Sequence, residues 1–190
     1  MRLPDERVEV RLAGTGGQGV ILAGMILAEA ALLDGRAVVQ VQNYGPEARG
    51  GASVADVVIS THEVDYPQVL QADVLIALSQ EALHKFAAGV REDGLILTDE
   101  EVDLMQDDRR VVRLPLTRLA FAASGRAIAA NIVALGAVTA LTGLVSRPAL
   151  ETAVKRRAPR GTEAVNMKAL EAGFAAVETD KIATQTTLSR

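Results

Sequence analysis

The sequence predicts an α/β protein with a three-layer, Rossmann-like, doubly wound and mostly parallel sheet, followed by a helical C-terminal portion. Three observations support this prediction. Short runs rich in β-branched residues alternate with helical segments as far as Leu114. A glycine-rich loop separates the first such run from the first helix. After Pro115 the apolar residues recur at helical spacing almost to the end of the chain.

The first elements form a strand, a tight loop, a helix and a second strand. Val8–Ala13 alternates and contains β-branched residues, as a strand does. The apolar residues of Gln18–Leu33 recur at helical spacing, and Asp34-Gly35 ends that helix. Ala37–Gln42 alternates again. We expect a βαβ unit whose two strands run parallel.

The next strand, Ser53–Ser60, is expected to run antiparallel because no helix precedes it. The later elements are expected as a strand at Asp73–Leu78, a helix at Gln80–Ala88, strands at Gly94–Thr98 and Val111–Leu114, and helices at Leu116–Ala123, Arg126–Leu144, Arg147–Arg157 and Thr162–Val177. The chain shows no internal repeat or long linker. Residues 1–178 are therefore expected to form a single α/β domain and residues 179–190 a loose tail.

The composition excludes several classes of function. A net charge of -4 gives no general field for nucleic acid. The chain has no Cys, so it supplies no disulfide, no thiolate ligand for an iron–sulfur cluster and no thiol nucleophile. The charged start, Met1–Arg7, lacks the apolar stretch of a secretory signal, so a cytoplasmic location is expected. No group of residues has the spacing of a metal site. The carboxylates of Glu100–Asp103 and Asp107-Asp108 resemble a paired-carboxylate site, but they lie in a polar stretch without apolar neighbours to raise a pKa, so a solvated loop explains them better.

The candidate binding loop follows the first strand and opens the first helix. It consists of Gly14, Thr15, Gly16, Gly17, Gln18 and Gly19, which match the G-x-G-x-x-G spacing. Glycine lets the backbone approach an anion closely, and the N–H groups at the helix start point at it, so a phosphate or pyrophosphate is the expected ligand. The structural alternative is that the glycines only let the helix cross close to the sheet.

Two nucleotide classes fit this loop poorly. A dinucleotide site requires an acidic residue at the end of the second strand, but Val39–Asn43 contains none, which disfavours NAD and FAD. A Walker-type loop is excluded because the Gly-Lys-Ser/Thr sequence is missing.

A second loop follows the second strand and is expected at the same carboxyl edge of the sheet, so that the two loops form a crevice. Its candidate residues are Tyr44, Gly45, Glu47, Arg49, Gly50 and Gly51. The Arg49 guanidinium suits a phosphate or a partner's carboxylate, and the Tyr44 ring suits stacking on a flat group. The alternative is a Gly-Pro turn with an internal ion pair between Glu47 and Arg49.

Both loops together resemble the γ-subunit, or γ-domain, of the 2-oxoacid:ferredoxin oxidoreductases, in which Gly-x-Gly-Gly-Gln-Gly and Tyr-Gly-x-Glu-x-Arg-Gly-Gly recur. The chain is most similar to the branch that acts on 2-oxoglutarate. The resemblance covers Val10 to Gly173. It continues through Asp65–Pro67, Ala77–Ala82, Asn131–Gly136 and Asn166–Gly173.

The resemblance implies a multi-subunit enzyme that converts a 2-oxoacid and coenzyme A into an acyl-CoA and carbon dioxide. Thiamine diphosphate, Mg²⁺ and iron–sulfur clusters belong to α and β partners, and in some members to a ferredoxin-like δ partner. The γ-part then holds coenzyme A and contributes no catalytic residue. The alternatives are a purely structural scaffold subunit, or a γ-type subunit for another 2-oxoacid such as an aryl or branched-chain one.

The resemblance also implies roles for particular residues. The ligand phosphates are expected near Gly16–Gly19, with Thr15 and Gln18 as side-chain donors and Arg49 as charge partner. Asn131 interrupts an apolar helix and is a further candidate, because a buried amide needs partners. The basic cluster of Lys155–Arg157 with Arg160 is either a solvated helix end or a grip on a coenzyme A phosphate. The isolated His62 and His84 are given no role.

Overall fold

The computed structural model describes residues 3, 6–44, 52–104, 108 and 110–188. Six strands form one sheet in the order β2-β3-β1-β4-β5-β6. The strands are β1 (Arg7–Gly14), β2 (Ala37–Tyr44), β3 (Ser53–Ser60), β4 (Ala72–Ala77), β5 (Val90–Asp99) and β6 (Val111–Leu114). The helices are α1 (Val20–Leu33), α2 (Gln80–Phe86), α3 (Leu116–Ser124), α4 (Ala130–Thr142), α5 (Arg147–Arg157) and α6 (Glu163–Leu188), with short 3₁₀ turns η1 (Ala87–Gly89) and η2 (Ala127–Ala129).

Strand β3 lies between β1 and β2 and is antiparallel to both of them. The predicted antiparallel direction of Ser53–Ser60 is thereby confirmed. The strands β1 and β2 run in the same direction, as predicted, but they do not pair as the simplest βαβ unit would. The reason is that β3 returns from β2 without a crossover helix, so it pairs antiparallel with β2 and occupies the place beside β1. The remaining pairs, β1–β4, β4–β5 and β5–β6, are parallel.

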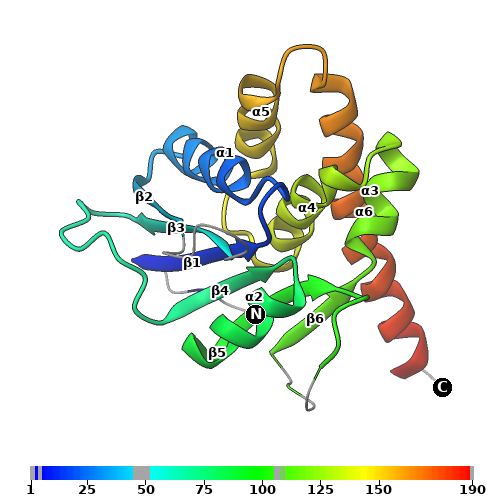
Figure 1. The fold of residues 1–190 in the computed structure, drawn as a ribbon, viewed down its shortest axis with the longest axis horizontal. Coiled ribbons are helices and arrows are strands. Elements are labelled where there is room, and N and C mark those ends of the chain that lie inside the picture. The colour runs from blue at the N-terminus through cyan, green and yellow to red at the C-terminus, as the bar shows by residue number, and fades with distance from the viewer. Residues whose placement is uncertain (1–2, 4–5, 45–51, 105–107, 109, 189–190) are drawn as a thin grey trace.

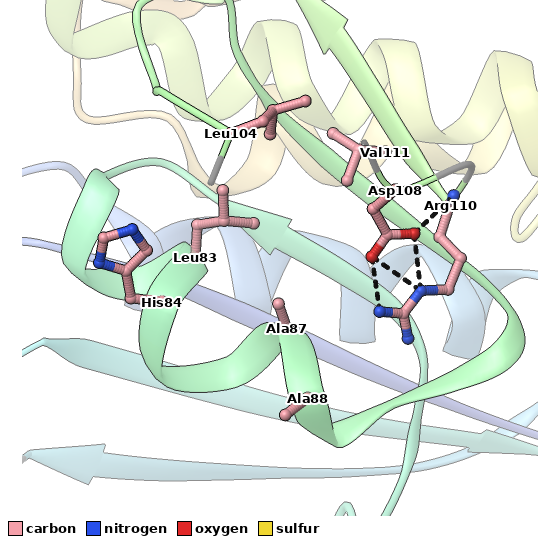
Figure 2. A pocket seen from close by; sticks show the side chains of 8 residues that line it. All are labelled: Leu83, His84, Ala87, Ala88, Leu104, Asp108, Arg110 and Val111. Carbon is pink, nitrogen blue, oxygen red and sulfur yellow. Dashed lines mark hydrogen bonds and ion pairs between the residues drawn. The ribbon is translucent and has the colours of Figure 1, made fainter. Parts of the chain in front are cut away.

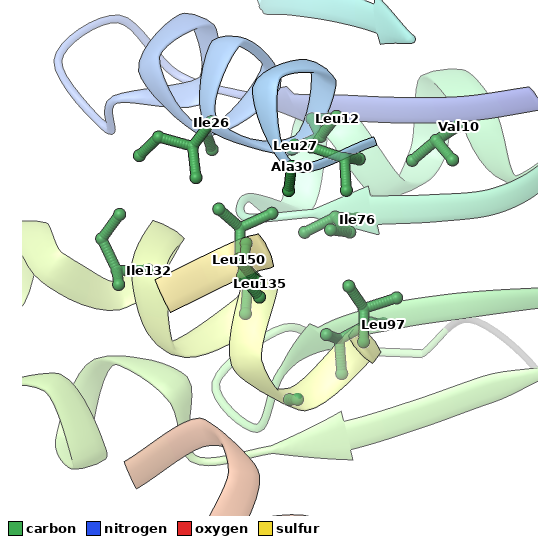
Figure 3. Packing of buried hydrophobic residues seen from close by; sticks show 14 of the residues in the cluster. Val10, Leu12, Ile26, Leu27, Ala30, Ile76, Leu97, Ile132, Leu135 and Leu150 are labelled. Carbon is green, nitrogen blue, oxygen red and sulfur yellow. The ribbon is translucent and has the colours of Figure 1, made fainter. Parts of the chain in front are cut away.

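Helices cover both faces of the sheet, which confirms the predicted α/β architecture (Figure 1). The helices α1, α4 and α5 lie over one face and α2 over the other. Alternate strand residues enter the two cores: Val74 and Ile76 face the α1 side, and Leu75 and Ala77 face the α2 side. Figure 3 shows the larger core, where side chains of the sheet meet those of α1 and α4.

The helices α4 and α6 cross in close contact because each carries a glycine at the crossing point. A Cβ atom on Gly136 would collide with the carbonyl oxygen of Leu170 in α6. A Cβ atom on Gly173 would collide with the carbonyl oxygen of Val133 in α4. Backbone therefore packs directly on backbone here, which leaves no space for a methyl group.

The C-terminal segment differs from the expected loose tail, because α6 continues as far as Leu188. The chain contains no Gly or Pro between Val177 and Leu188 that would end the helix. Among the described residues no single helix is long and apolar enough to cross a membrane, although the bent pair Leu116–Ser124 and Ala127–Thr142 passes by length and composition.

Ion pairs from the basic cluster of Lys155–Arg157 join α5 to α1. Arg157 and Arg156 both pair with Glu29 of α1. The hydrogen bond from Arg157 is the main reason that the pKa of Glu29 lies below its ordinary value. Both arginines lie in the last turn of α5 and are about half exposed, as the interpretation as a solvated helix end predicts, and their pairs with Glu29 add a link between two helices.

Replacing Glu29 with Gln is expected to change stability in a pH-dependent way. A lowered pKa in the folded state means that ionised Glu29 stabilises the fold near neutral pH, and that this contribution is lost as the pH falls through that pKa. We expect Glu29→Gln to lower the free energy of unfolding by less than about 1 kcal/mol at neutral pH, because both arginines are half exposed. Urea unfolding over a pH series checks this. A difference between variant and wild type that persists in acid would contradict the ion-pair explanation.

Candidate functional site

The glycine loop joins β1 to α1 through two left-handed residues, Gly17 with φ 89° and Gly19 with φ 71°. Gly19 caps α1, and the first helical bond runs from the N–H of Ala23 to the carbonyl oxygen of Gly19. The N–H groups of the first helical turn therefore have no acceptor within the helix. Their positive potential makes this end of α1 suitable for an anion.

Gln18 holds the loop in place with its own side chain. Its Oε1 accepts the N–H of Thr15 at 2.7 Å, and its Nε2 donates to the carbonyl oxygen of Leu78 at 2.8 Å. A Cβ atom on Gly14 would collide with this Oε1, so a larger residue there would displace the Gln18 amide from this position. Gln18 thus ties the loop to the end of β4, and only one N–H of its amide is left for the predicted role as a ligand donor.

Asn131, from the first turn of α4, holds the other end of the loop. It is 5% exposed, its Nδ2 donates to the carbonyl oxygen of Gly19 at 2.9 Å, and its Oδ1 accepts the N–H of Ile132 at 2.8 Å. A Cβ atom on Gly19 would collide with that Nδ2. The buried amide predicted at this position therefore has partners, and they position the start of α1.

A pocket of about 380 Å³, here called the loop pocket, opens beside the glycine loop. A Cβ atom on Gly16 would meet no other atom within 4 Å, so this residue faces open space. The pocket is lined by Gly16, Gly17, Gln18, Leu78, Asp99, Thr117, Ala127, Ile128 and Ala130. The starts of α1, α3 and the η2–α4 segment therefore meet around it.

Sequence reasoning missed the strand-end and helical residues of this pocket, above all Asp99. This side chain is 6% exposed, and its carboxylate accepts the N–H of Thr117 at 2.7 Å and the N–H of Glu101 at 3.1 Å. It thereby caps the start of α3. The available signal was its place directly after an apolar strand, because the carboxyl ends of parallel strands share one edge of the sheet.

The predicted second loop begins at the same edge. Tyr44, the last residue of β2, and Gly14, the last residue of β1, both stand opposite Ser53 of β3 in the sheet. The other predicted residues of this loop, Gly45, Glu47, Arg49, Gly50 and Gly51, lie outside the described residues. Their proposed contacts with a ligand stay predictions.

Two further cavities differ in their relation to the loop. One of about 250 Å³, here called the Arg126 cavity, adjoins the loop pocket at Ile128 and also borders Gly19 and Asn131. The other, of about 270 Å³, is lined by residues next to the amino ends of β5 and β6 and by no residue of the glycine loop; Figure 2 shows its lining side chains. Its two charged groups, Asp108 and Arg110, form a bidentate ion pair.

Metal-binding groups do not gather anywhere in the described chain: no three His, Asp or Glu residues there lie close enough together to hold an ion. His84 contacts Gln80 of its own helix at 2.8 Å, and His62 contacts the adjacent Thr61 at 3.0 Å. Both are exposed residues with local partners, as expected for residues without an assigned role.

Fold and site together define an α/β protein with a glycine-rich loop at the carboxyl edge of its sheet, beside a pocket of about 380 Å³. A family model described as pyruvate ferredoxin/flavodoxin oxidoreductase matches residues 9–176, and the chain belongs to this family. The predicted resemblance to γ-subunits of 2-oxoacid:ferredoxin oxidoreductases is confirmed by the relatives of the chain.

Three of these relatives are informative. The chain is 46% identical over 173 residues to 2-oxoglutarate synthase subunit KorC of Methanocaldococcus jannaschii, covering 88% of this chain and 92% of that protein. The γ-subunit of a keto/oxoacid ferredoxin oxidoreductase from Geobacter sulfurreducens superposes with a TM-score of 0.82 at 45% identity, covering 91% and 97% of the two chains. The 2-oxoglutarate:ferredoxin oxidoreductase of Magnetococcus marinus superposes with a TM-score of 0.80 at 23% identity, which shows a shared fold over 93% of this chain and 32% of that one.

Proposed function

We propose that this chain is the γ-subunit of a multi-subunit 2-oxoglutarate:ferredoxin oxidoreductase and that its glycine loop seats the pyrophosphate of coenzyme A. The name of the M. jannaschii relative, a 2-oxoglutarate synthase subunit that this chain matches over most of both lengths, supports the assembly and its substrate. The M. marinus enzyme was solved with 2-oxoglutarate, coenzyme A and succinyl-CoA bound, and part of it has the same fold as this chain.

The observation that carries the proposal is the open backbone at Gly16 and Gly17 over the loop pocket. No acceptor within the described residues pairs with the N–H groups of these two glycines. Unpaired N–H groups at the start of a helix bind phosphate oxygens, and a pocket of about 380 Å³ has room for such a group.

Asp99 adds a second requirement on the ligand. Its carboxylate lines the same pocket and already accepts two backbone N–H groups, which leaves lone pairs for a further donor. A ligand that fits therefore places an anion at the glycine loop and an N–H or O–H group toward Asp99. Coenzyme A carries both, a pyrophosphate and the amide and hydroxyl groups of its pantetheine arm.

The other groups that the reaction needs are proposed to belong to partner subunits. This chain has no Cys, so it offers no thiolate to an iron–sulfur cluster. We assign thiamine diphosphate, Mg²⁺ and the clusters to α and β partners, with a ferredoxin-like δ partner where one exists. This subunit then contributes binding and assembly and takes no part in bond making.

Hydrogen exchange of the assembled complex tests the coenzyme A role. Adding coenzyme A is expected to slow deuterium uptake at the amides of residues 14–19, because phosphate oxygens would accept their N–H groups. Amides of η1, which lies away from the loop pocket, serve as the internal reference. Protection confined to the partner chains would overturn the coenzyme A role and favour a scaffold subunit. Turnover with an aryl or branched-chain 2-oxoacid in place of 2-oxoglutarate would redirect the substrate assignment.

A further inference from the structure

The Arg126 cavity and the loop pocket share one lining residue. Ile128, which is 61% exposed, lines both of them. The loop pocket borders Gly16–Gln18, and the Arg126 cavity borders Gly19 and Leu22, so both lie along the start of α1. One ligand that passes over Ile128 can therefore reach both.

The two cavities differ in charge. Asp99 lines the loop pocket, whereas Arg126 lines the other cavity and no Asp or Glu is among the described residues that line it. Arg126 has no side-chain partner in the described part of the chain. Its backbone is held because Ser124 Oγ accepts its N–H at 3.2 Å and donates to Ala120 at 2.6 Å. A fixed backbone with an unpaired guanidinium is suited to bind an anion.

Polar residues that line the Arg126 cavity favour the same ligand charge. Asn131 uses one of its two Nδ2 hydrogens on Gly19, which leaves the second as a donor at this cavity. Thr162 and Asn166 line the wall at the start of α6, where the helix dipole is positive. Glu163, in the first turn of α6, is not among the lining residues.

We propose that the Arg126 cavity is a second anion subsite and that Arg126 is the charge partner of the 3′-phosphate of coenzyme A. This inference rests on the proposed function, because it places the pyrophosphate of the same molecule at the glycine loop. Coenzyme A carries its pyrophosphate and its 3′-phosphate on one ribose, which matches two adjacent cavities along one helix start. The subsite then distinguishes coenzyme A from analogues that lack the 3′-phosphate.

The test compares coenzyme A with 3′-dephospho-coenzyme A in the assembled complex, as apparent KM values at saturating 2-oxoglutarate. The wild-type complex is expected to have a lower KM for coenzyme A than for 3′-dephospho-coenzyme A. Arg126→Gln is expected to raise that KM by about tenfold or more, because a charged hydrogen bond to phosphate is lost, and to leave the KM for the dephospho analogue unchanged. Arg118→Gln is the matched control, since Arg118 is an exposed arginine of α3 that pairs with Glu100 and lines none of the three cavities.

The possible outcomes distinguish failure of the Arg126 subsite from failure of the proposed coenzyme A function. The thermal midpoint of the Arg126→Gln variant is first compared with that of wild type, to show that the variant is folded. If the substitution then raises the KM values for coenzyme A and its dephospho analogue equally, or raises neither, the proposed subsite is overturned. Blocking the loop pocket with Gly16→Leu is expected to raise both KM values. If that variant changes neither, the proposed coenzyme A function itself fails, whatever Arg126 does.

Discussion

Gly173→Ala is expected to lower the free energy of unfolding by about 3 kcal/mol, at the upper end for an added methyl group in a packed interior. The new Cβ would collide with the Val133 carbonyl oxygen and would also lie 2.9 Å from the Ala137 nitrogen, both of them backbone atoms of α4. A backbone atom cannot turn aside as a flexible side chain does, so the two helices must separate. Urea unfolding of the purified chain measures the effect.

Gly89→Ala is the control for this substitution. Gly89 ends η1 outside the left-handed region, and a Cβ atom there meets nothing within 4 Å. We expect a change within about 0.5 kcal/mol for this variant. Equal stability of the Gly173→Ala variant and wild type would show that the α4–α6 crossing is looser than described. Because α4 carries Asn131, a shifted crossing is also expected to disturb the start of α1.

Gly16→Leu is expected to raise the apparent KM for coenzyme A by about two orders of magnitude while the fold is retained. The new side chain enters the loop pocket, where it displaces the phosphate oxygens and removes charged hydrogen bonds. Gly16 suits this purpose better than Gly17, because Gly17 has φ 89° and any side chain there would also strain the backbone. Steady-state kinetics of the assembled complex with varied coenzyme A measure the effect.

Two controls make this result specific. Gly89→Leu adds the same side chain to an equally open glycine away from the loop pocket, so its KM is expected to equal that of wild type. The apparent KM for 2-oxoglutarate is expected to stay constant in both variants, because the 2-oxoacid is assigned to the partner subunits. A Gly16→Leu complex that saturates with coenzyme A as wild type does would contradict the assignment of the glycine loop.

Local patterns predicted most elements of the fold, and long-range packing accounts for the differences. Alternation predicted β3 with the bounds found in the structure, and the missing crossover helix predicted its direction. The position of β3 between β1 and β2 depends on which strand edge is free after β1 and α1 have packed. A local sequence pattern does not predict this long-range arrangement. The continuation of α6 to Leu188 was not predicted, because the last residues of a chain are commonly loose and the same was expected here.

The candidate site shows the same division. The glycine loop was found because its signal lies within six consecutive residues next to a strand and a helix. Asp99 and Ile128 were missed because only the fold brings them to that loop. Gln18 and Asn131 were identified by position, but their contacts with Leu78 and Gly19 depend on neighbours far along the chain. Sequence spacing therefore predicts that these residues belong to the site, but it does not predict their hydrogen-bond partners.

The most direct test of the central claim is a structure of the assembled complex with coenzyme A bound. We expect pyrophosphate oxygens within hydrogen-bonding distance, about 3 Å, of the backbone nitrogens of Gly16 and Gly17. Gln18 is expected to keep its hydrogen bonds to Thr15 and Leu78, as in the free chain. Coenzyme A held wholly by partner subunits, with a partner's side chain filling the loop pocket, would contradict this claim.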